Sequence, residues 1–82
     1  MKYRTIAWGT RIDLWQRRSD GWWERIALRE MCGMGTRWYT AVFPLVQRNP
    51  DAGAGEVMKD FTEDEILETY PELLVEMFRT SA

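Results

Sequence analysis

Residues 19–30, SDGWWERIALRE, decide how the first half of the chain folds. A turn signal, Ser19-Asp20-Gly21, is followed by two adjacent tryptophans and then by alternating residues. Neighbouring side chains in an extended strand point to opposite faces, so Trp22 and Trp23 cannot both enter the same core. The stretch therefore predicts a strand that carries a tryptophan on each of its two faces.

The residues before the turn, 11–17, also alternate, and they predict the partner strand of a hairpin. A three-residue loop over 19–21 places apolar residues opposite one another, whereas a two-residue loop places apolar residues opposite charged ones. The three-residue loop pairs Leu14 with Ile26 and Ile12 with Leu28. The pattern therefore favours this loop, with Gly21 at the positive φ angle that closes it.

This register divides the tryptophans between two faces. Trp22 joins the apolar face and is expected to cap the core at the hairpin end. The opposite face combines tryptophans with arginines, the two residue types enriched in binding hot spots. We predict that this Arg/Trp surface is the partner contact, formed by Trp15, Arg17, Trp23 and Arg25 and extended by Trp38. A self-satisfied cation–π ladder, or a second buried layer beneath a dimer partner, is the alternative interpretation.

The rest of the chain adds strands and then helix. Residues 2–8 and 36–47 predict further strands, and Pro44 indicates an edge position or a bulge. Thr62 and Glu65 fit a capping box, and apolar residues recur after them at helical spacing. Pro71 either divides this segment into helices at about 63–69 and 71–79 or kinks one helix.

The predicted fold class is α+β, in a single domain that spans residues 1–82. A small antiparallel sheet of three to four strands, a hairpin or meander, occupies residues 1–47. Residues 48–60 form a loop, and the helical region, 61–80, packs on one face of the sheet. Cys32 is the one cysteine, so no intramolecular disulfide can form, and a reducing, cytoplasmic compartment is expected.

Composition argues against an enzyme. There is no histidine, which removes the commonest general base and the usual nitrogen ligand of zinc. The carboxylates around residues 51–60 match no calcium-loop spacing, so we expect neither a metal nor another cofactor. No apolar run approaches the roughly 20 residues that a membrane-spanning helix needs.

Charge is unevenly distributed along the chain. Residues 1–50 hold nine Lys/Arg and four Asp/Glu, a balance of +5, whereas residues 51–82 hold two and nine, a balance of −7. The two halves either pack together and screen each other or form separate basic and acidic binding faces. The acidic segment is a solvated helix face or a second contact patch for basic partners, with Glu63, Asp64, Glu68 and Glu72 as its candidate residues.

In size, acidity and lack of catalytic residues the chain resembles the small acidic α+β proteins of phages and mobile elements that disable host machinery, anti-CRISPR proteins among them. The resemblance implies a non-enzymatic protein-binding inhibitor that blocks a host protein or complex by steric occlusion. The alternative is a small single-stranded nucleic-acid-binding protein that uses the Arg/Trp surface. A homodimer is a third option. On the leading hypothesis, Trp23→Ala abolishes partner binding and leaves the fold nearly intact.

Overall fold

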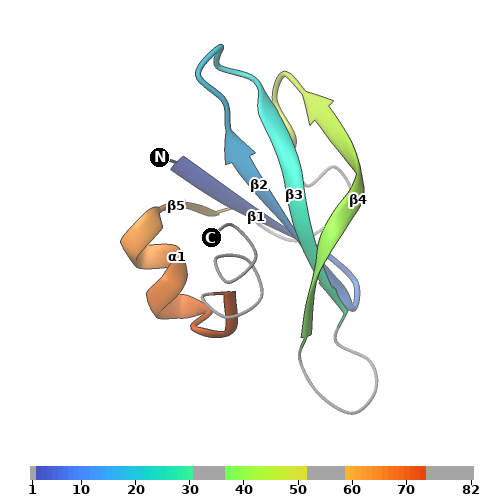
Figure 1. Ribbon diagram of the computed structural model, residues 1–82, viewed down its shortest axis with the longest axis vertical. Helices are drawn as coiled ribbons and strands as arrows, with labels where there is room; N and C mark the ends of the chain where they lie inside the picture. The colour runs from blue at the N-terminus through green and yellow to red at the C-terminus, as the bar shows by residue number, and fades with distance from the viewer. Residues whose placement is uncertain (1, 31–36, 52–58, 74–82) are drawn as a thin grey trace.

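The computed structural model describes residues 2–30, 37–51 and 59–73. Within them, one antiparallel sheet has the strand order β4-β3-β2-β1-β5. The strands are β1 (Lys2–Trp8), β2 (Arg11–Arg17), β3 (Trp23–Glu30), β4 (Arg37–Gln47) and β5 (Lys59–Thr62). The chain runs through β1 to β4 as a meander and then returns to the far side, where β5 pairs with β1 (Figure 1).

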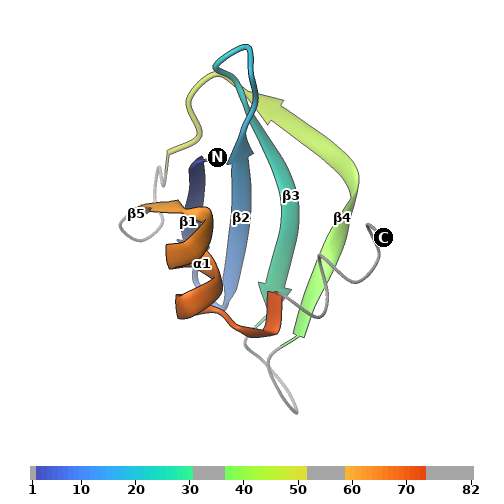
Figure 2. The ribbon, with the colours of Figure 1, turned by 60° about the vertical axis from the view of Figure 1, so that its left-hand side comes forward.

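Helix α1 (Glu63–Thr69) follows β5 directly and lies across one face of the sheet (Figure 2). The capping box is present: the Glu65 N–H donates to Thr62 Oγ1 at 3.3 Å, and the Thr62 N–H donates to Glu65 Oε1 at 3.0 Å. At the other end, the Tyr70 N–H donates to the Ile66 carbonyl at 2.9 Å. Pro71 follows and has no N–H with which to continue the ladder, so the helix ends as predicted.

The prediction of three to four strands with one kinked or two short helices is wrong. The sheet has five strands, and α1 is the one helix whose bounds lie within the described ranges, although Glu72 and Leu73 are also helical. The unpredicted strand is β5, which straddles the predicted loop and the start of the predicted helical region. Its four residues are too few to show an alternation, and its pairing with β1 joins residues far apart in the chain. Most of the expected second helix, 71–79, lies outside the described residues.

The loop between β2 and β3 has the predicted length. The Arg18 N–H donates to the Trp22 carbonyl at 2.7 Å, and the Gly21 N–H donates to the Arg18 carbonyl at 3.0 Å. Gly21 has a φ angle of +88°, which glycine adopts without the steric cost that a side chain would add. Next to the loop, Arg17 lies opposite Trp23, as the sequence predicted.

Further along the hairpin the register shifts by one residue. Trp15 pairs with Arg25, but Leu14 pairs with Ala27, which leaves Ile26 as the extra residue of a β-bulge. The predicted Leu14–Ile26 and Ile12–Leu28 pairs are therefore wrong. After the bulge the faces of β3 are exchanged, so that Ala27 enters the core beneath the helix and Leu28 lies opposite Asp13.

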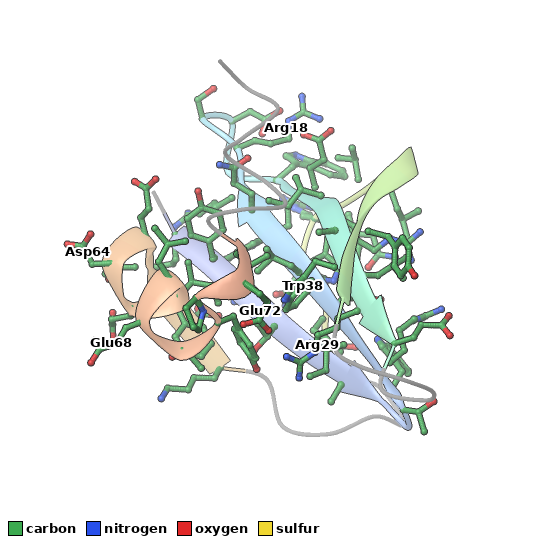
Figure 3. The ribbon with its side chains drawn as sticks, turned by 60° about the horizontal axis from the view of Figure 1, so that its bottom comes forward. Arg18, Arg29, Trp38, Asp64, Glu68 and Glu72 are labelled. Atoms are coloured by element: carbon green, nitrogen blue, oxygen red, sulfur yellow. The ribbon has the colours of Figure 1, made fainter. Side chains whose placement is uncertain are left out.

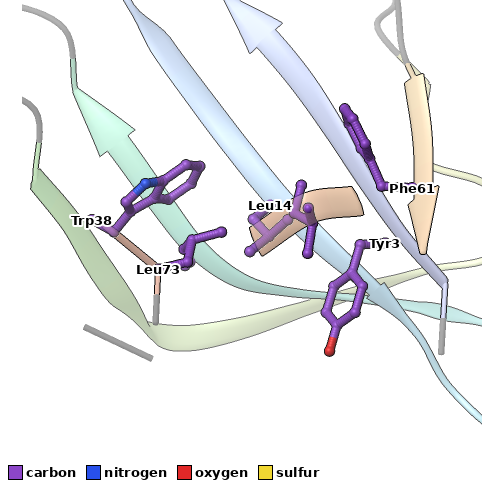
Figure 4. Close-up of a cluster of buried hydrophobic side chains, with 7 residues drawn as sticks. Tyr3, Leu14, Trp38, Phe61 and Leu73 are labelled. Atoms are coloured by element: carbon purple, nitrogen blue, oxygen red, sulfur yellow. The ribbon is translucent and has the colours of Figure 1, made fainter. Parts of the chain in front are cut away.

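The main core lies between the sheet and the helical side of the molecule (Figure 4). All five strands and the residues around α1 contribute to it, so it fixes the sheet and the helix together. Its buried members are Tyr3, Leu14, Ala27, Trp38, Phe61, Ile66 and Leu73. Full burial of an aliphatic or aromatic side chain of this size stabilises the fold by about 1.5–3 kcal/mol.

A second, smaller core lies on the opposite face of the sheet and consists of Ile6, Trp15 and Trp23. Each member comes from a different strand, β1, β2 or β3. Antiparallel sheets often leave one face to solvent. This sheet buries apolar side chains on both faces, and that decides which residues remain exposed for a partner.

Candidate functional site

The predicted Arg/Trp surface does not expose its tryptophans. Trp15, Trp23 and Trp38 are 3 %, 4 % and 1 % exposed. Trp15 and Trp23 share the predicted face, but Trp38 lies in the core on the other face. Of the two arginines, Arg17 is exposed and Arg25 is half-buried. The structure therefore brings four of the five residues to one face, as a layer of packed indoles bordered by arginines.

Arg4 covers the second core. Its guanidinium carbon lies 4.2 Å from the centre of the Trp23 ring. Its Nε donates to Asp60 of β5 at 2.6 Å, and its Nη1 donates to the Asn49 side chain and the Pro50 carbonyl, each at 2.9 Å. This hydrogen bond from Arg4 lowers the pKa of Asp60. Segments distant in sequence thus hold the cation that keeps Trp23 from solvent.

A buried carboxylate accompanies this core. Asp13 is 2 % exposed, and its oxygens lie 3.0 Å from Arg11 Nε and 3.7 Å from Arg25 Nη1. Burial raises the pKa of Asp13, and the two arginines oppose that rise. The indole Nε1 of nearby Trp15 is buried without a hydrogen-bond partner among the described residues. The ion pairs offset only part of the cost of burying this carboxylate, because Asp13 Oδ1 has no hydrogen-bond partner among the described residues.

The four residues of the predicted acidic contact patch do not all face solvent (Figure 3). Glu72 turns toward the sheet, where its Oε1 accepts hydrogen bonds from Arg29 Nη1 at 2.8 Å and from Trp38 Nε1 at 3.1 Å. The other candidates, Glu63, Asp64 and Glu68, lie exposed on α1. The sequence placed all four on one surface, and the structure leaves three of them there.

An aromatic and cationic cluster surrounds Glu72. Arg29 lies 5.4 Å from the Trp38 ring centre and 5.0 Å from that of Tyr70, and the two rings meet edge to face at 5.4 Å. Burial pushes the pKa of Glu72 upward, but hydrogen bonds from its own backbone, Trp38 and Arg29 outweigh that effect and lower it. The cluster joins the residues after α1 to β3 and β4.

Four of the five exposed large hydrophobic side chains among the described residues lie on or beside β4, the strand at one edge of the sheet. Tyr39, Leu45 and Val46 lie on β4 itself and are 51 %, 41 % and 38 % exposed. Val46 pairs with Glu24 of β3, two residues from the 42 % exposed Trp22. We define the β4 flank as Trp22, Tyr39, Leu45, Val46 and the exposed Arg48.

The β4 flank does not follow from the hairpin register, which places Trp22 on the apolar face and predicts that it caps the core. The structure exposes the Trp22 side chain at the hairpin end, and the backbone N–H of Trp22 donates to Asp20 Oδ1 at 3.0 Å. One signal in the sequence could have indicated this exposure. Residues 36–47 carry apolar side chains on both faces, and they contain Pro44, which favours an edge position.

The described residues offer little for small-molecule or metal chemistry. An open groove of about 470 Å³ is lined by Lys2, Asp60, Phe61, Thr62 and Glu65. Both of its carboxylates already have partners, because Asp60 binds Arg4 and Glu65 binds Thr62. Within 2–30, 37–51 and 59–73, no group of three or more potential metal ligands comes together. Over the same ranges, helical segments lack the length and hydropathy for crossing a bilayer.

Comparison of the chain with protein-family models, with curated proteins and with solved structures gives no match.

Proposed function

We propose that the chain is a non-enzymatic protein-binding module, and that it occludes a partner's surface through the β4 flank. One observation carries the proposal. A domain that buries three of its five tryptophans still leaves four large apolar side chains exposed on or beside one edge strand, on both of its faces. Large exposed apolar side chains that concentrate in one part of a small domain are typical of protein-interaction sites.

The composition of the flank supports the same function. Trp, Tyr and Arg are the residue types that most often dominate the binding energy of an interface. Trp22, Tyr39 and Arg48 supply one of each, and Leu45 and Val46 add aliphatic area around them. This patch replaces the Arg/Trp surface as the proposed contact. The nucleic-acid alternative requires exposed indoles on that surface, and the burial of Trp15 and Trp23 gives it no support.

The proposed function is tested by capture from a nuclease-treated bacterial lysate. The bait is the full chain, and the test variant is Tyr39→Ser/Leu45→Ser. Trp8→Ser is the matched control, because Trp8 is also an exposed large hydrophobic, at 36 %, but lies on β1, separated from β4 by two strands. Circular dichroism and thermal unfolding establish that all three proteins are folded.

We expect one protein, or one complex, to be retained by the wild-type chain and by Trp8→Ser, and to be lost from the double variant. Retention by all three baits would exclude the β4 flank as the contact. If nothing is retained except nucleic acid, and nuclease removes it, the chain is not a protein-binding module.

A further inference from the structure

We propose that the β4 flank binds its partner by strand addition: an extended segment of the partner protein, apolar in its centre and acidic at its ends, pairs with the outer edge of β4. This inference depends on the proposed function and specifies the binding mode and the chemistry of the partner.

The backbone of β4 provides the first step. β4 is 11 residues long and comes last in the strand order, and among the described strands it pairs with β3 alone. An end strand directs a row of N–H and C=O groups away from the sheet, and an incoming extended chain can satisfy them. The pairing of β4 with β3 is regular over 37–40 and 45–47 and irregular between them, so an added segment would pair with these two stretches of the edge.

The opposite edge of the sheet shows the contrast. β5 has four residues, and its first residue is the exposed Lys59. Short edge strands and exposed lysines are two devices by which proteins prevent unwanted strand pairing. At β4, the exposed positions Tyr39, Leu45 and Val46 are apolar instead. The two edges therefore differ in the way expected if only β4 accepts a strand.

Side chains on both faces of β4 can contact an added strand. Leu45 pairs with Arg25, on the face of the second core, whereas its neighbour Val46 pairs with Glu24 on the opposite face. The residues of an incoming strand alternate between the same two faces. Apolar residues of the partner would then pack beside Leu45 on one face and beside Val46 and Trp22 on the other.

Charge determines which strand fits. Residues 37–48 contain two arginines, Arg37 and Arg48, and no acidic residue. An antiparallel second copy of β4 would bring Arg37 of each chain toward Arg48 of the other, and like charges placed opposite each other are destabilising. Exposed Arg17 adds positive charge at the hairpin end of the sheet, where Arg18 is paired with Asp20 at 3.0 Å. A segment with acidic ends therefore fits, and a second copy does not.

The experiment is a selection from a displayed library of random twelve-residue peptides against the full chain. We expect enriched peptides with β-branched or aromatic centres, no proline, and Asp or Glu at the ends. The best peptide is then synthesised with backbone N-methyl groups on one set of alternate residues or on the other. Methylation of the set that faces β4 should abolish binding, whereas methylation of the other set should leave the affinity within about threefold.

A charge-reversed variant gives the second readout. Arg48→Glu should weaken the selected acidic peptide about tenfold at low salt, and Trp8→Ser should not change its affinity. Amide shifts in NMR spectra should be concentrated on β4. Strand addition is wrong if the selection enriches no such peptides, or if neither methylated set loses affinity. It is also wrong if β4 amides become protected with chain concentration alone, because a second copy is then the occupant.

The two proposals fail separately. If the peptide experiment excludes strand addition, the capture experiment with Tyr39→Ser/Leu45→Ser can still succeed. The β4 flank would then bind its partner through side chains alone. Failure of the capture experiment removes the protein partner, whatever peptides the selection yields.

Discussion

At the scale of single residues, Trp22 and Trp23 are adjacent in the chain but are 42 % and 4 % exposed. Their opposite directions follow from the pleat of a strand. Their exposure follows from what covers each face. Arg4 lies over Trp23 and is itself held by Asp60 and by the Asn49–Pro50 segment. The buried tryptophan is therefore a structural residue, and the exposed one is available for binding.

Trp23→Ala should destabilise the fold by about 3–5 kcal/mol, because it leaves a cavity in the second core and removes the ring beneath Arg4. Trp22→Ala should change the free energy of unfolding by less than about 1 kcal/mol. Urea unfolding at pH 7 measures both, and Trp23→Phe provides a milder variant if Trp23→Ala does not fold. Equal effects of the two alanine variants would contradict the assignment of Trp23 to a core.

Asp13 should make stability depend on pH in the direction opposite to most carboxylates. Burial raises its pKa in the folded state, so the folded chain holds this proton after the unfolded chain has lost it. Its contribution is fully present below the unfolded pKa and is lost as pH rises through the folded pKa. The stability of Asp13→Asn relative to wild type should therefore increase from pH 3 to pH 7, measured by urea unfolding at each pH. A difference that stays flat with pH would contradict the raised pKa.

At the scale of elements, features set by short stretches of sequence could be predicted, such as the ends of the helix and the length of a loop. The capping box and Pro71 set the ends of α1, and Gly21 sets the length of the β2–β3 loop. Long-range features could not be predicted in this way. β5 is defined by its pairing with β1, and the bulge at Ile26 contains no glycine or proline that would announce it.

The same distinction applies to the candidate site. Pro44 indicated an edge position or a bulge, and β4 lies at the sheet edge with a register shift between Thr40 and Leu45. The hairpin register placed Trp15 and Trp23 on one face, as observed. The burial of that face depends on Arg4, Asn49 and Asp60, three residues brought together by the tertiary fold. Alternation predicts which side chains share a face, but it does not predict whether that face is covered.

Thr62→Ala should cost about 1 kcal/mol of stability, because the Glu65 N–H loses its acceptor at the start of α1. Thr62→Ser keeps the hydroxyl and should restore most of the loss, which makes it the matched control. Thermal unfolding and helical circular dichroism measure the effect. If serine and alanine behave alike, the cap does not stabilise the helix.

At the scale of the whole molecule, ion pairs join the basic and acidic halves of the chain. Arg4 binds Asp60 at 2.6 Å, and Arg29 binds Glu72 at 2.8 Å. These contacts agree with the interpretation that the halves pack together, while some charge of each sign stays at the surface. Arg17 and Arg48 are exposed at the hairpin end, where Arg18 is paired with Asp20, and Glu63, Asp64 and Glu68 are exposed on α1. The molecule is therefore charged oppositely at two places, which can orient it toward a charged partner.

The decline of the free energy of unfolding at acid pH should depend on the Arg4–Asp60 and Arg29–Glu72 ion pairs. Their hydrogen bonds lower the pKa of Asp60 and, against the effect of burial, that of Glu72, so both contributions are present above the unfolded pKa values and are lost as pH falls through the folded ones. Asp60→Asn/Glu72→Gln should flatten the decline of stability below pH 5, measured by urea unfolding. Glu68→Gln, at an exposed position, is the control. An unchanged slope in the double variant would show that other carboxylates control acid unfolding.

The bulge at Ile26 also has a genetic consequence. Most single substitutions in β3 alter one side chain, and an in-frame deletion of the Ile26 codon would remove only the extra residue. Ala27 would then follow Arg25 directly, and its pair with Leu14 and that of Leu28 with Asp13 would be kept. A further residue inserted elsewhere in the strand would instead turn over the residues beyond it. Descendants of this sequence should therefore tolerate the loss of one residue at the bulge better than the gain of one elsewhere in β3.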